Sequence, residues 1–364
     1  MSADVILVIV VATALAFDFT NGFHDTANVV ATSISTRAMP PKVAVGFAAV
    51  LNFVGAFISL QVAATVAKDV VQAGAITPTV VFAGLIGAIA WNLATWWFGL
   101  PSSSSHALIG GVVGSTIAAA GFDAVLADGV LGKVLLPALI APTVAFVAGL
   151  LAINVAYGIT GRERPGPVTR GFRLGQVVSG GMLALAHGTN DAQKTMGVIT
   201  LALIANGSLS EDAGVPFWVV VSAATAIALG TYSGGWRIIK TMGTRIIKMD
   251  TAQGFSAQGA GAATILASTH FGFPLSTTHV ISGGVMGAGA GKRVSAVRWG
   301  VAGNIVVAWL LTLPAAAAIG AAVYAFSTLF GDGAAGPVVI SLLAMAGSLA
   351  LFMRRSHTPV LAAG

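Results

Sequence analysis

Long apolar stretches separated by short polar connections run along almost the whole chain. Eleven of them approach or exceed the roughly 20 residues that a helix needs to cross the hydrocarbon of a bilayer. They cover residues 5–36, 43–67, 78–99, 101–121, 133–160, 174–204, 215–235, 254–271, 274–291, 299–328 and 336–353. A transmembrane β-barrel would instead show short segments of alternating polarity. The pattern predicts an all-α polytopic membrane protein with about 11 transmembrane segments, of which 101–121 and 274–291 are short enough to be re-entrant hairpins instead.

The composition and the placement of charge agree with a membrane location. Only 8% of the residues are charged and 56% are hydrophobic, whereas an ordinary soluble domain carries about 25% charged residues. With the N-terminus outside, nearly all Lys and Arg residues fall in inner loops, as the positive-inside rule requires. We therefore expect a multi-pass protein of the cell inner (plasma) membrane with a cytoplasmic C-terminus. The net charge of +6 is spread over loops, so no nucleic-acid partner is expected.

Two short motifs each occur twice, in the same order. PSSSSHALIGG at 101–111 matches PLSTTHVISGG at 274–284, and NGFHDTAN at 21–28 matches HGTNDAQK at 187–194. The chain thus divides into a first repeat (1–160), a cytoplasmic linker (161–173), a second repeat (174–330) and an extra C-terminal transmembrane helix with a tail (331–364). Each half holds an odd number of segments, so we expect two inverted repeats, as in secondary transporters whose site lies where the repeats meet.

Asp25 and Asp191 are paired by this match, and each falls within an apolar segment, where a carboxylate costs several kcal/mol. A satisfied structural aspartate is an alternative for either residue alone, but it explains a matched pair less well. Each aspartate lies beside a glycine and polar residues. We therefore expect broken helices at these positions, with free backbone groups that bind ions.

The second motif places hydroxyls after a proline, and Pro101 and Pro274 can each start a helix. We expect the hydroxyls and the free N–H groups of the first turns to form two facing cradles around one tetrahedral oxyanion. The hydroxyl residues are Ser103, Ser104, Ser105, Ser276, Thr277 and Thr278. The alternative is that the hydroxyls bond back to their own helices. The glycines that follow allow a neighbouring backbone to pack closely; they are Gly110, Gly111, Gly283 and Gly284.

The paired carboxylates narrow the choice of anion. A carboxylate repels a fully ionised oxyanion but accepts a hydrogen bond from a protonated one, and sulfate has no proton to donate at neutral pH. The aspartates can also hold a cation that binds together with the anion. The motif therefore favours phosphate with a coupled cation. We interpret the nearby histidines as packing or hydrogen-bonding residues, with His24 and His187 also able to carry protons.

At these residues the chain resembles the Pit family of inorganic phosphate transporters. The resemblance covers nearly the whole chain, and the flanking TRAMPP (36–41) and WNLATWWFGLP (91–101) are similar to the bacterial low-affinity branch. It implies phosphate symport, an inverted-repeat helical fold and a homodimer. It also implies that Asp25, Asn28, Asp191 and the hydroxyl clusters bind substrate and cation.

Two positions depart from the family pattern. Sodium-coupled relatives look like Gly-Ala-Asn-Asp-Val-Ala-Asn in both copies. Here Phe23 and His24 precede Asp25, and Lys194 stands in the second copy where the first has Asn28. A fixed ammonium can replace a bound cation, so we expect Lys194 to supply the charge that Na⁺ brings elsewhere. The resemblance to the low-affinity branch likewise implies proton symport and metal–phosphate complexes.

We therefore expect a secondary active symporter that imports inorganic phosphate, as the free anion or as a neutral metal–phosphate complex, coupled to protons. A sodium-coupled phosphate symporter and a sulfate permease on the same scaffold are the alternatives. An intramembrane hydrolase fits less well, because no Gly-x-Ser-x-Gly turn is present, and we expect no enzymatic activity. No cofactor is expected beyond the coupled cation, which is a proton or, as the alternative, sodium, and a divalent metal that accompanies phosphate. The expected substrate ligands are Asp25, Asn28, Ser103, Ser104, Ser105, Asn190, Asp191, Lys194, Ser276, Thr277 and Thr278, and the expected cation ligands are Asp25, Asn28 and Asp191.

Overall fold

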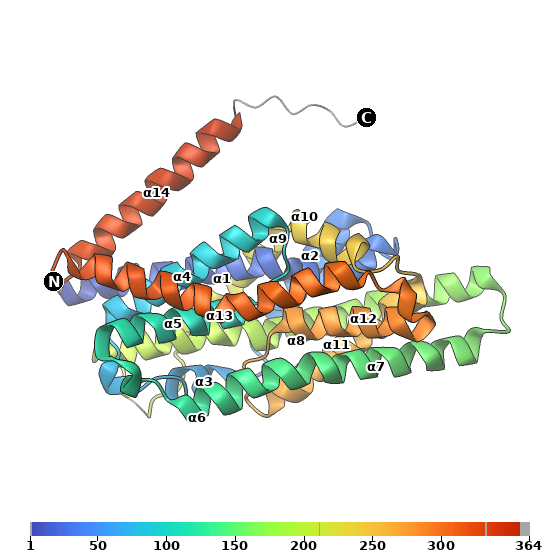
Figure 1. The fold of residues 1–364 in the computed structure, drawn as a ribbon, viewed down its shortest axis with the longest axis horizontal. Helices are drawn as coiled ribbons and strands as arrows, with labels where there is room; N and C mark the ends of the chain where they lie inside the picture. Colours follow the sequence, from blue (N-terminus) through green and yellow to red (C-terminus); the bar gives the residue numbers. More distant parts are fainter. Residues whose placement is uncertain (1, 211, 332, 357–364) are drawn as a thin grey trace.

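The computed structural model describes residues 2–210, 212–331 and 333–356, and this part of the chain is almost entirely helical (Figure 1). All eleven apolar stretches form helices, so the all-α prediction is confirmed. The helices are α1 (Ser2–Ser35), α2 (Pro41–Gly55), α3 (Gln61–Lys68), α4 (Pro78–Phe98), α5 (Ser104–Ala120), α6 (Ala127–Gly129), α7 (Leu136–Thr160), α8 (Pro165–Ala205), α9 (Phe217–Ser233), α10 (Trp236–Lys240), α11 (Thr251–His270), α12 (Thr277–Lys292), α13 (Trp299–Thr328) and α14 (Ala335–Ser356). A helical stretch at Val130–Leu135 joins α6 to α7.

The two halves of the bundle pack in matching pairs of helices. In the first half α1 contacts α4, and α4 contacts α5; in the second half α8 contacts α11, and α11 contacts α12. The halves also exchange contacts in matching fashion. α1 packs on α9 as α8 packs on α2, and α5 packs on α13 as α12 packs on α7. The sequence repeat is thus accompanied by a repeat of the packing.

α4 and α5 form a helical hairpin, as do α11 and α12, and the two hairpins start at opposite ends of the bundle (Figure 1). A backbone bridge between Val71 and Val125 joins the segments that flank the first hairpin. At the other end, Asp250 before α11 pairs with Lys292 at the end of α12 at 3.0 Å. The tips meet, since the Ser105 hydroxyl donates to the Leu275 carbonyl at 3.1 Å. Two hairpins that enter from opposite ends and touch at their tips each reach only part of the way through.

The expectation of eleven crossings is therefore not supported, because each hairpin had been counted as two of them. Four helices of the described residues are long and apolar enough to cross a membrane: Asp4–Ser35, Pro78–Phe98, Ala127–Thr160 and Trp299–Thr328. Pro78–Phe98 meets this test by length and hydropathy, but it is α4, the first arm of a hairpin, and its position in the hairpin argues against a full crossing. A fifth candidate is Phe217–Ser233 with Trp236–Arg245, which is bent by 59°.

The expected helix breaks at Asp25 and Asp191 are not found, because α1 and α8 run through both residues without interruption. The neighbouring glycines serve close helix packing instead. A Cβ on Gly22 would lie 2.3 Å from the Ile227 carbonyl oxygen, and one on Gly188 would lie 2.1 Å from that of Asn52. The chain breaks instead between the hairpin arms and between α2 and α3. α8 also begins at Pro165, inside the segment expected to be a linker, because proline fits the first turn of a helix.

Small residues let the hairpin helices approach their partners, as the glycine pairs predicted. A Cβ on Gly110 would lie 2.5 Å from the Leu313 carbonyl oxygen of α13, and one on Gly283 would lie 2.3 Å from that of Pro142 in α7. These contacts leave no room for a side chain. They fix the depth at which α5 and α12 sit in the bundle.

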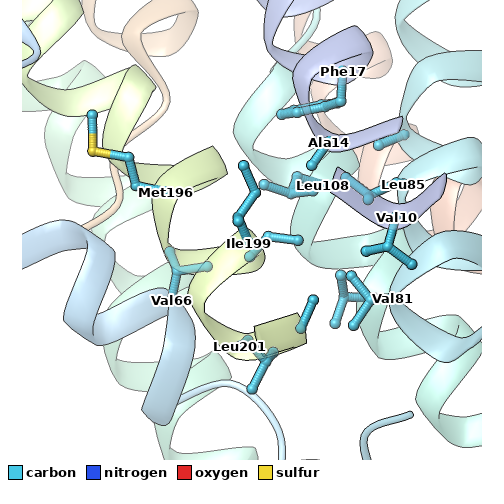
Figure 2. Packing of buried hydrophobic residues seen from close by; sticks show 14 of the residues in the cluster. Val10, Ala14, Phe17, Val66, Val81, Leu85, Leu108, Met196, Ile199 and Leu201 are labelled. Atoms are coloured by element: carbon cyan, nitrogen blue, oxygen red, sulfur yellow. The ribbon is translucent and has the colours of Figure 1, made fainter. Parts of the chain in front are cut away.

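The buried apolar side chains form two clusters, one toward each end of the bundle. The first joins the N-terminal part of α1 to α3, α4, α5 and the second half of α8 (Figure 2). The second joins α7, α11 and α12 to the C-terminal part of α1. Between them lies a buried polar region that contains both aspartates.

Candidate functional site

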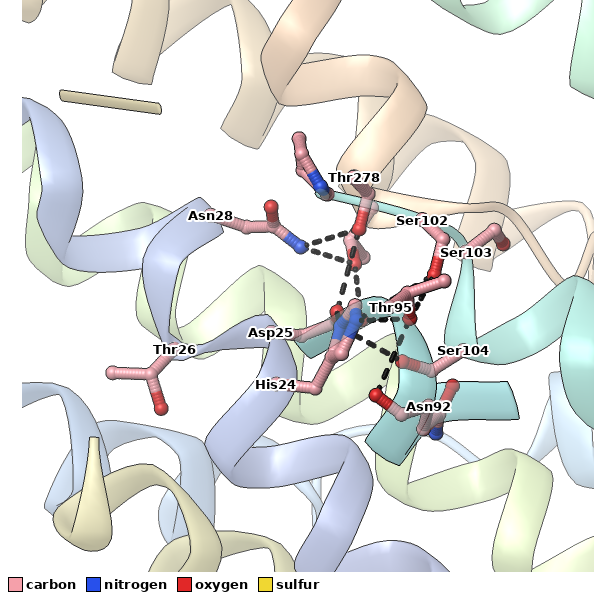
Figure 3. Close-up of polar contacts among 12 residues, drawn as sticks. His24, Asp25, Thr26, Asn28, Asn92, Thr95, Ser102, Ser103, Ser104 and Thr278 are labelled. Atoms are coloured by element: carbon pink, nitrogen blue, oxygen red, sulfur yellow. Dashed lines mark hydrogen bonds and ion pairs between the residues drawn. The ribbon is translucent and has the colours of Figure 1, made fainter. Parts of the chain in front are cut away.

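The polar region is built from four segments: α1, α8 and the tips of the two hairpins. All eleven substrate ligands expected from the sequence are buried, and none is more than 3% exposed. Figure 3 shows one side of this cluster, where His24 and Asp25 of α1 face Ser102 and Ser104 of the first hairpin and Thr278 of the second. The structure therefore gathers residues that are up to about 250 positions apart in the sequence.

The second helix of each hairpin is capped by a serine and does not start at the proline. Ser103 is the N-cap of α5 and accepts a hydrogen bond from the His106 N–H, and Ser276 does the same for His279 in α12. The expectation that Pro101 and Pro274 start the helices is wrong, because Ser103 and Ser276, two residues after the prolines, are still extended. Ser103 and Ser276 thus bond to their own helices. The other N–H groups at the start of each helix have no backbone partner within the helix.

Asp25 lies between a histidine of its own helix and two threonines of the second hairpin. His24 Nδ1 is 2.7 Å from Asp25 Oδ1. The Thr278 hydroxyl donates to the same oxygen at 3.3 Å, and the Thr277 hydroxyl lies 3.5 Å from Oδ2. The carboxylate of the first repeat is therefore held by hydroxyls of the second repeat.

Asp191 has a cation and a histidine beside it, both from α8. Lys194 Nζ donates to Asp191 Oδ1, and His187 Nε2 lies 3.0 Å from Oδ2. The Thr277 hydroxyl donates to Oδ2 at 3.1 Å. Thr277 thus reaches both aspartates and places their carboxylates next to each other.

The side chain three residues after each aspartate reaches across to the hydroxyls of the opposite repeat. Asn28 Nδ2 donates to Thr278 Oγ1 at 2.8 Å, and Lys194 Nζ donates to Ser105 Oγ at 2.5 Å and to the Leu275 carbonyl at 2.7 Å. The residue before each aspartate instead contacts a threonine in the hairpin of the same repeat. These pairs are His24 with Thr95 at 3.1 Å and Asn190 with Thr269 at 2.9 Å.

The charges in this site do not cancel. Two buried carboxylates face one buried ammonium, and the two histidines are positioned to accept or share protons. Asp25, His187 and Asp191 each offer a ligand atom within 4.8 Å of the others, which is close enough to hold one metal ion. Asn28 Oδ1 has no hydrogen-bond partner and remains available to a cation or to a substrate proton.

Sequence reasoning missed several members of this site. It ranked His24 and His187 below the aspartates, although each pairs with one of them, and it overlooked Ser102, whose hydroxyl donates to Thr95 at 2.8 Å. Outside the contacts of this site, it also passed over Asp18, a fully buried acid on α1. The signal for Asp18 was present: it stands in the same apolar stretch as Asp25, seven residues earlier and hence on the same helix face.

The fold combines helices that cross the molecule with two hairpins that meet at their tips beside a buried charged site. This combination defines a membrane transport protein. The model of the phosphate transporter family matches the chain twice, over residues 21–166 and 159–320. The chain belongs to the phosphate transporter family. The double match corresponds to the two halves identified from the motifs.

Several relatives carry names that agree with this family. A probable low-affinity inorganic phosphate transporter of Mycobacterium leprae is 54% identical over 98% of this chain and 86% of its own length. Proteins of the same name from Rhizobium meliloti and Bacillus subtilis are 50% and 45% identical, over 88% of this chain and 96% of their own lengths. These relatives are named as transporters and not as hydrolases.

A solved structure shares the fold. It is titled the sodium-dependent phosphate transporter, and it matches 89% of this chain and 99% of its own chain with a TM-score of 0.80 at 24% identity. At that identity the match shows the architecture only.

Proposed function

We propose that the protein is a secondary active symporter that imports inorganic phosphate together with protons. The observation that carries this proposal is the meeting of both hairpin tips with both aspartates in one buried cluster. α5 and α12 begin at this cluster, so the N–H groups of their first residues lie beside it, and Ser104, Ser105, Thr277 and Thr278 add hydroxyls. Such helix starts bind phosphate groups in many proteins.

The aspartates favour a protonated oxyanion over a fully ionised one. A carboxylate is only an acceptor when ionised, so Asp25 and Asp191 can bond to a phosphate O–H and repel an anion that has none. Lys194 supplies a positive charge that is fixed in the site. This supports protons as the coupling ion, with sodium as the alternative.

We further propose that phosphate can enter as a neutral metal complex. Asp25, His187 and Asp191 present two carboxylates and an imidazole within reach of one divalent ion, and the hydroxyls of Thr277 and Thr278 lie on the same side. A metal there would be part of the cargo. Calorimetry with Mg²⁺ and phosphate, added singly and together, tests this: binding of Mg²⁺ that phosphate does not strengthen contradicts it.

We infer that the two halves are inverted repeats, each made of three crossings and one re-entrant hairpin. An odd number of crossings per half inverts the second half, and the matched packing of the halves supports this. In this arrangement the basic connections between α1 and α2, α7 and α8, and α12 and α13 share one end, which we place in the cytoplasm by the positive-inside rule. The N-terminus then lies outside the plasma membrane, and α14, as a seventh crossing after the two repeats, places the C-terminus inside. A homodimer stays a prediction, to be tested by cross-linking in membranes.

Counterflow of labelled phosphate in proteoliposomes tests the function. Vesicles loaded with unlabelled phosphate should accumulate label, and excess external sulfate should leave the uptake unchanged. A sodium gradient at constant pH should not drive net uptake, whereas an inward proton gradient should. Competition by sulfate would favour the sulfate permease, uptake driven by sodium would favour the sodium symporter, and absence of counterflow would contradict the transporter itself.

A further inference from the structure

Asp18 is a buried acid that the phosphate site does not use. It lies on α1, its side chain is 0% exposed, and neither of its carboxylate oxygens has a hydrogen-bond partner. The other buried acids of the described residues, Asp25 and Asp191, each have an ion pair and hydroxyl partners. An ionised carboxylate without a donor or a cation is costly inside a protein. Asp18 therefore differs from the aspartates that line the site.

Two polar neighbours of Asp18, Asn21 and Thr195, can each donate to an ionised carboxylate or accept from a protonated one. Asn21 Oδ1 and Thr195 Oγ1 are also buried without hydrogen-bond partners, and both side chains lie near enough to act on the carboxylate. A proton on Asp18 turns it into a donor that either oxygen can accept. One proton thus gives Asp18 one hydrogen bond, to Asn21 or to Thr195, and removes the cost of an unpaired buried charge.

The charged groups that face Asp18 are Asp191 and Lys194, both on α8. The other helices packed most closely on this part of α1 are α4 and α9, and their sequences contain no Asp, Glu, Lys, Arg or His. Ala14 and Phe17 beside it on α1 belong to the apolar cluster (Figure 2). Apart from its burial, the charged groups that act on Asp18 are therefore those of the phosphate site.

Asp18 is placed to report on the occupancy of that site. It precedes Asp25 by two helical turns, or about 10 Å, on the side where α1 begins. At this distance and an effective dielectric constant of about 20, one added negative charge shifts an ionisation equilibrium by about tenfold or more. Phosphate in the site therefore favours the protonated form of Asp18, and by reciprocity the proton favours phosphate.

We propose that Asp18 carries the proton that is transported with phosphate. This inference rests on the proposed phosphate symport. Asp18 binds the proton from the side where α1 begins, holds it while phosphate occupies the site, and releases it after phosphate leaves on the other side. The second repeat has Ala184 at the matching position, so the proton site occurs once and not twice.

The test compares Asp18→Asn with wild type in proteoliposomes. Asp128→Asn is the matched control, since Asp128 is an exposed acid far from the site in the chain. We expect Asp18→Asn to keep phosphate counterflow at equal pH within about twofold, because exchange needs no net proton movement. Accumulation driven by a proton gradient should fall at least tenfold, and Asp128→Asn should match wild type in both assays.

Each outcome is decisive. Accumulation by Asp18→Asn that equals wild type overturns the inference, and so does a folded variant that loses counterflow, because Asp18 would then serve phosphate binding itself. If wild type responds to sodium and Asp18→Asn abolishes that response, Asp18 is a metal-cation ligand and the proton assignment is wrong. Loss of counterflow in wild type contradicts the proposed function and is a separate result. Should Asp18→Asn fail to fold, Asp18→Glu decides: it should keep proton-driven accumulation, and its loss in a folded variant overturns the inference.

Discussion

Replacing Lys194 with asparagine should convert the site into one that needs an added cation. The ammonium is 1% exposed and makes three contacts, to Asp191, to Ser105 at 2.5 Å and to the Leu275 carbonyl at 2.7 Å. Asparagine is also the residue at the equivalent position of the first repeat, Asn28. The substitution thus keeps a polar side chain and removes one charge.

The size of the effect follows from the burial of the pair. Removing one partner of a buried ion pair costs about 3–5 kcal/mol, because the other charge is left uncompensated. Each 1.4 kcal/mol corresponds to a factor of ten, so we expect phosphate uptake to fall by roughly two to three and a half orders of magnitude. A sodium ion bound beside Asp191 would restore the missing charge and recover part of the rate.

The assay is the initial rate of labelled phosphate uptake in proteoliposomes, with sodium or choline as the external cation at constant pH. Lys133→Asn is the control, because Lys133 pairs with Asp69 at 2.7 Å while its side chain is 42% exposed, and such pairs contribute about 0–1 kcal/mol. Uptake by Lys194→Asn equal to wild type in choline would refute the electrostatic role of Lys194. A low rate that sodium does not raise would refute the idea that the ammonium stands in for a metal cation.

Three further changes test the site and its frame. Asn28→Ala removes the bond to Thr278 and should raise the half-saturating phosphate concentration about tenfold in uptake assays, from a loss of roughly 1–1.5 kcal/mol. Gly283→Ala should lower the melting temperature in detergent, since overpacking costs about 1–3 kcal/mol, whereas Gly300→Ala, with open space around it, should not. Burial raises the pKa of Asp250, but bonds from Tyr157, Gln253 and Lys292 outweigh it and lower that pKa overall. The stabilisation by Asp250 is thus present above its ordinary pKa of about 3.9 and is lost on acidification below it, so Asp250→Asn should flatten the melting temperature between pH 5 and about 3.

The helices were predictable because apolar length and hydropathy decide which segments can cross a bilayer. The depth of the hairpins was not. The α5 and α12 stretches are of a length that fits either a short crossing or a re-entrant arm. Contacts in the structure show that the tips meet, among them the bond from Ser105 to the Leu275 carbonyl. The continuity of α1 and α8 was also hidden, since a glycine beside an aspartate signals either a break or a close helix contact, and Gly22 makes the contact.

The residues of the candidate site were predictable from the duplicated motifs, but their pairing was not. Two copies of a motif do not reveal whether each aspartate faces the hydroxyls of its own repeat or of the other. The structure shows the exchange: Asp25 lies against Thr278, and Lys194 reaches Ser105. Asp18 illustrates the same limit, because the sequence shows an acid in an apolar segment but only packing shows that the acid has no partner.

The two halves share a scaffold but not a charge pattern, and this difference bears on coupling. Asp25 and Asp191 occupy equivalent positions of the two repeats. The position of Lys194 is occupied by Asn28 in the first repeat, and the position of Asp18 is occupied by Ala184 in the second. Two carboxylates and one ammonium leave the site with one negative charge, and a phosphate ion adds at least one more in a low-dielectric interior. Each uncompensated charge there is expensive, so the proposed symport needs at least one proton or cation for each phosphate. Without the ammonium, one more cation would be required. The number of coupled ions therefore depends on Lys194, and measuring the charge moved per phosphate in wild type and in Lys194→Asn, with an expected difference of one, tests this directly.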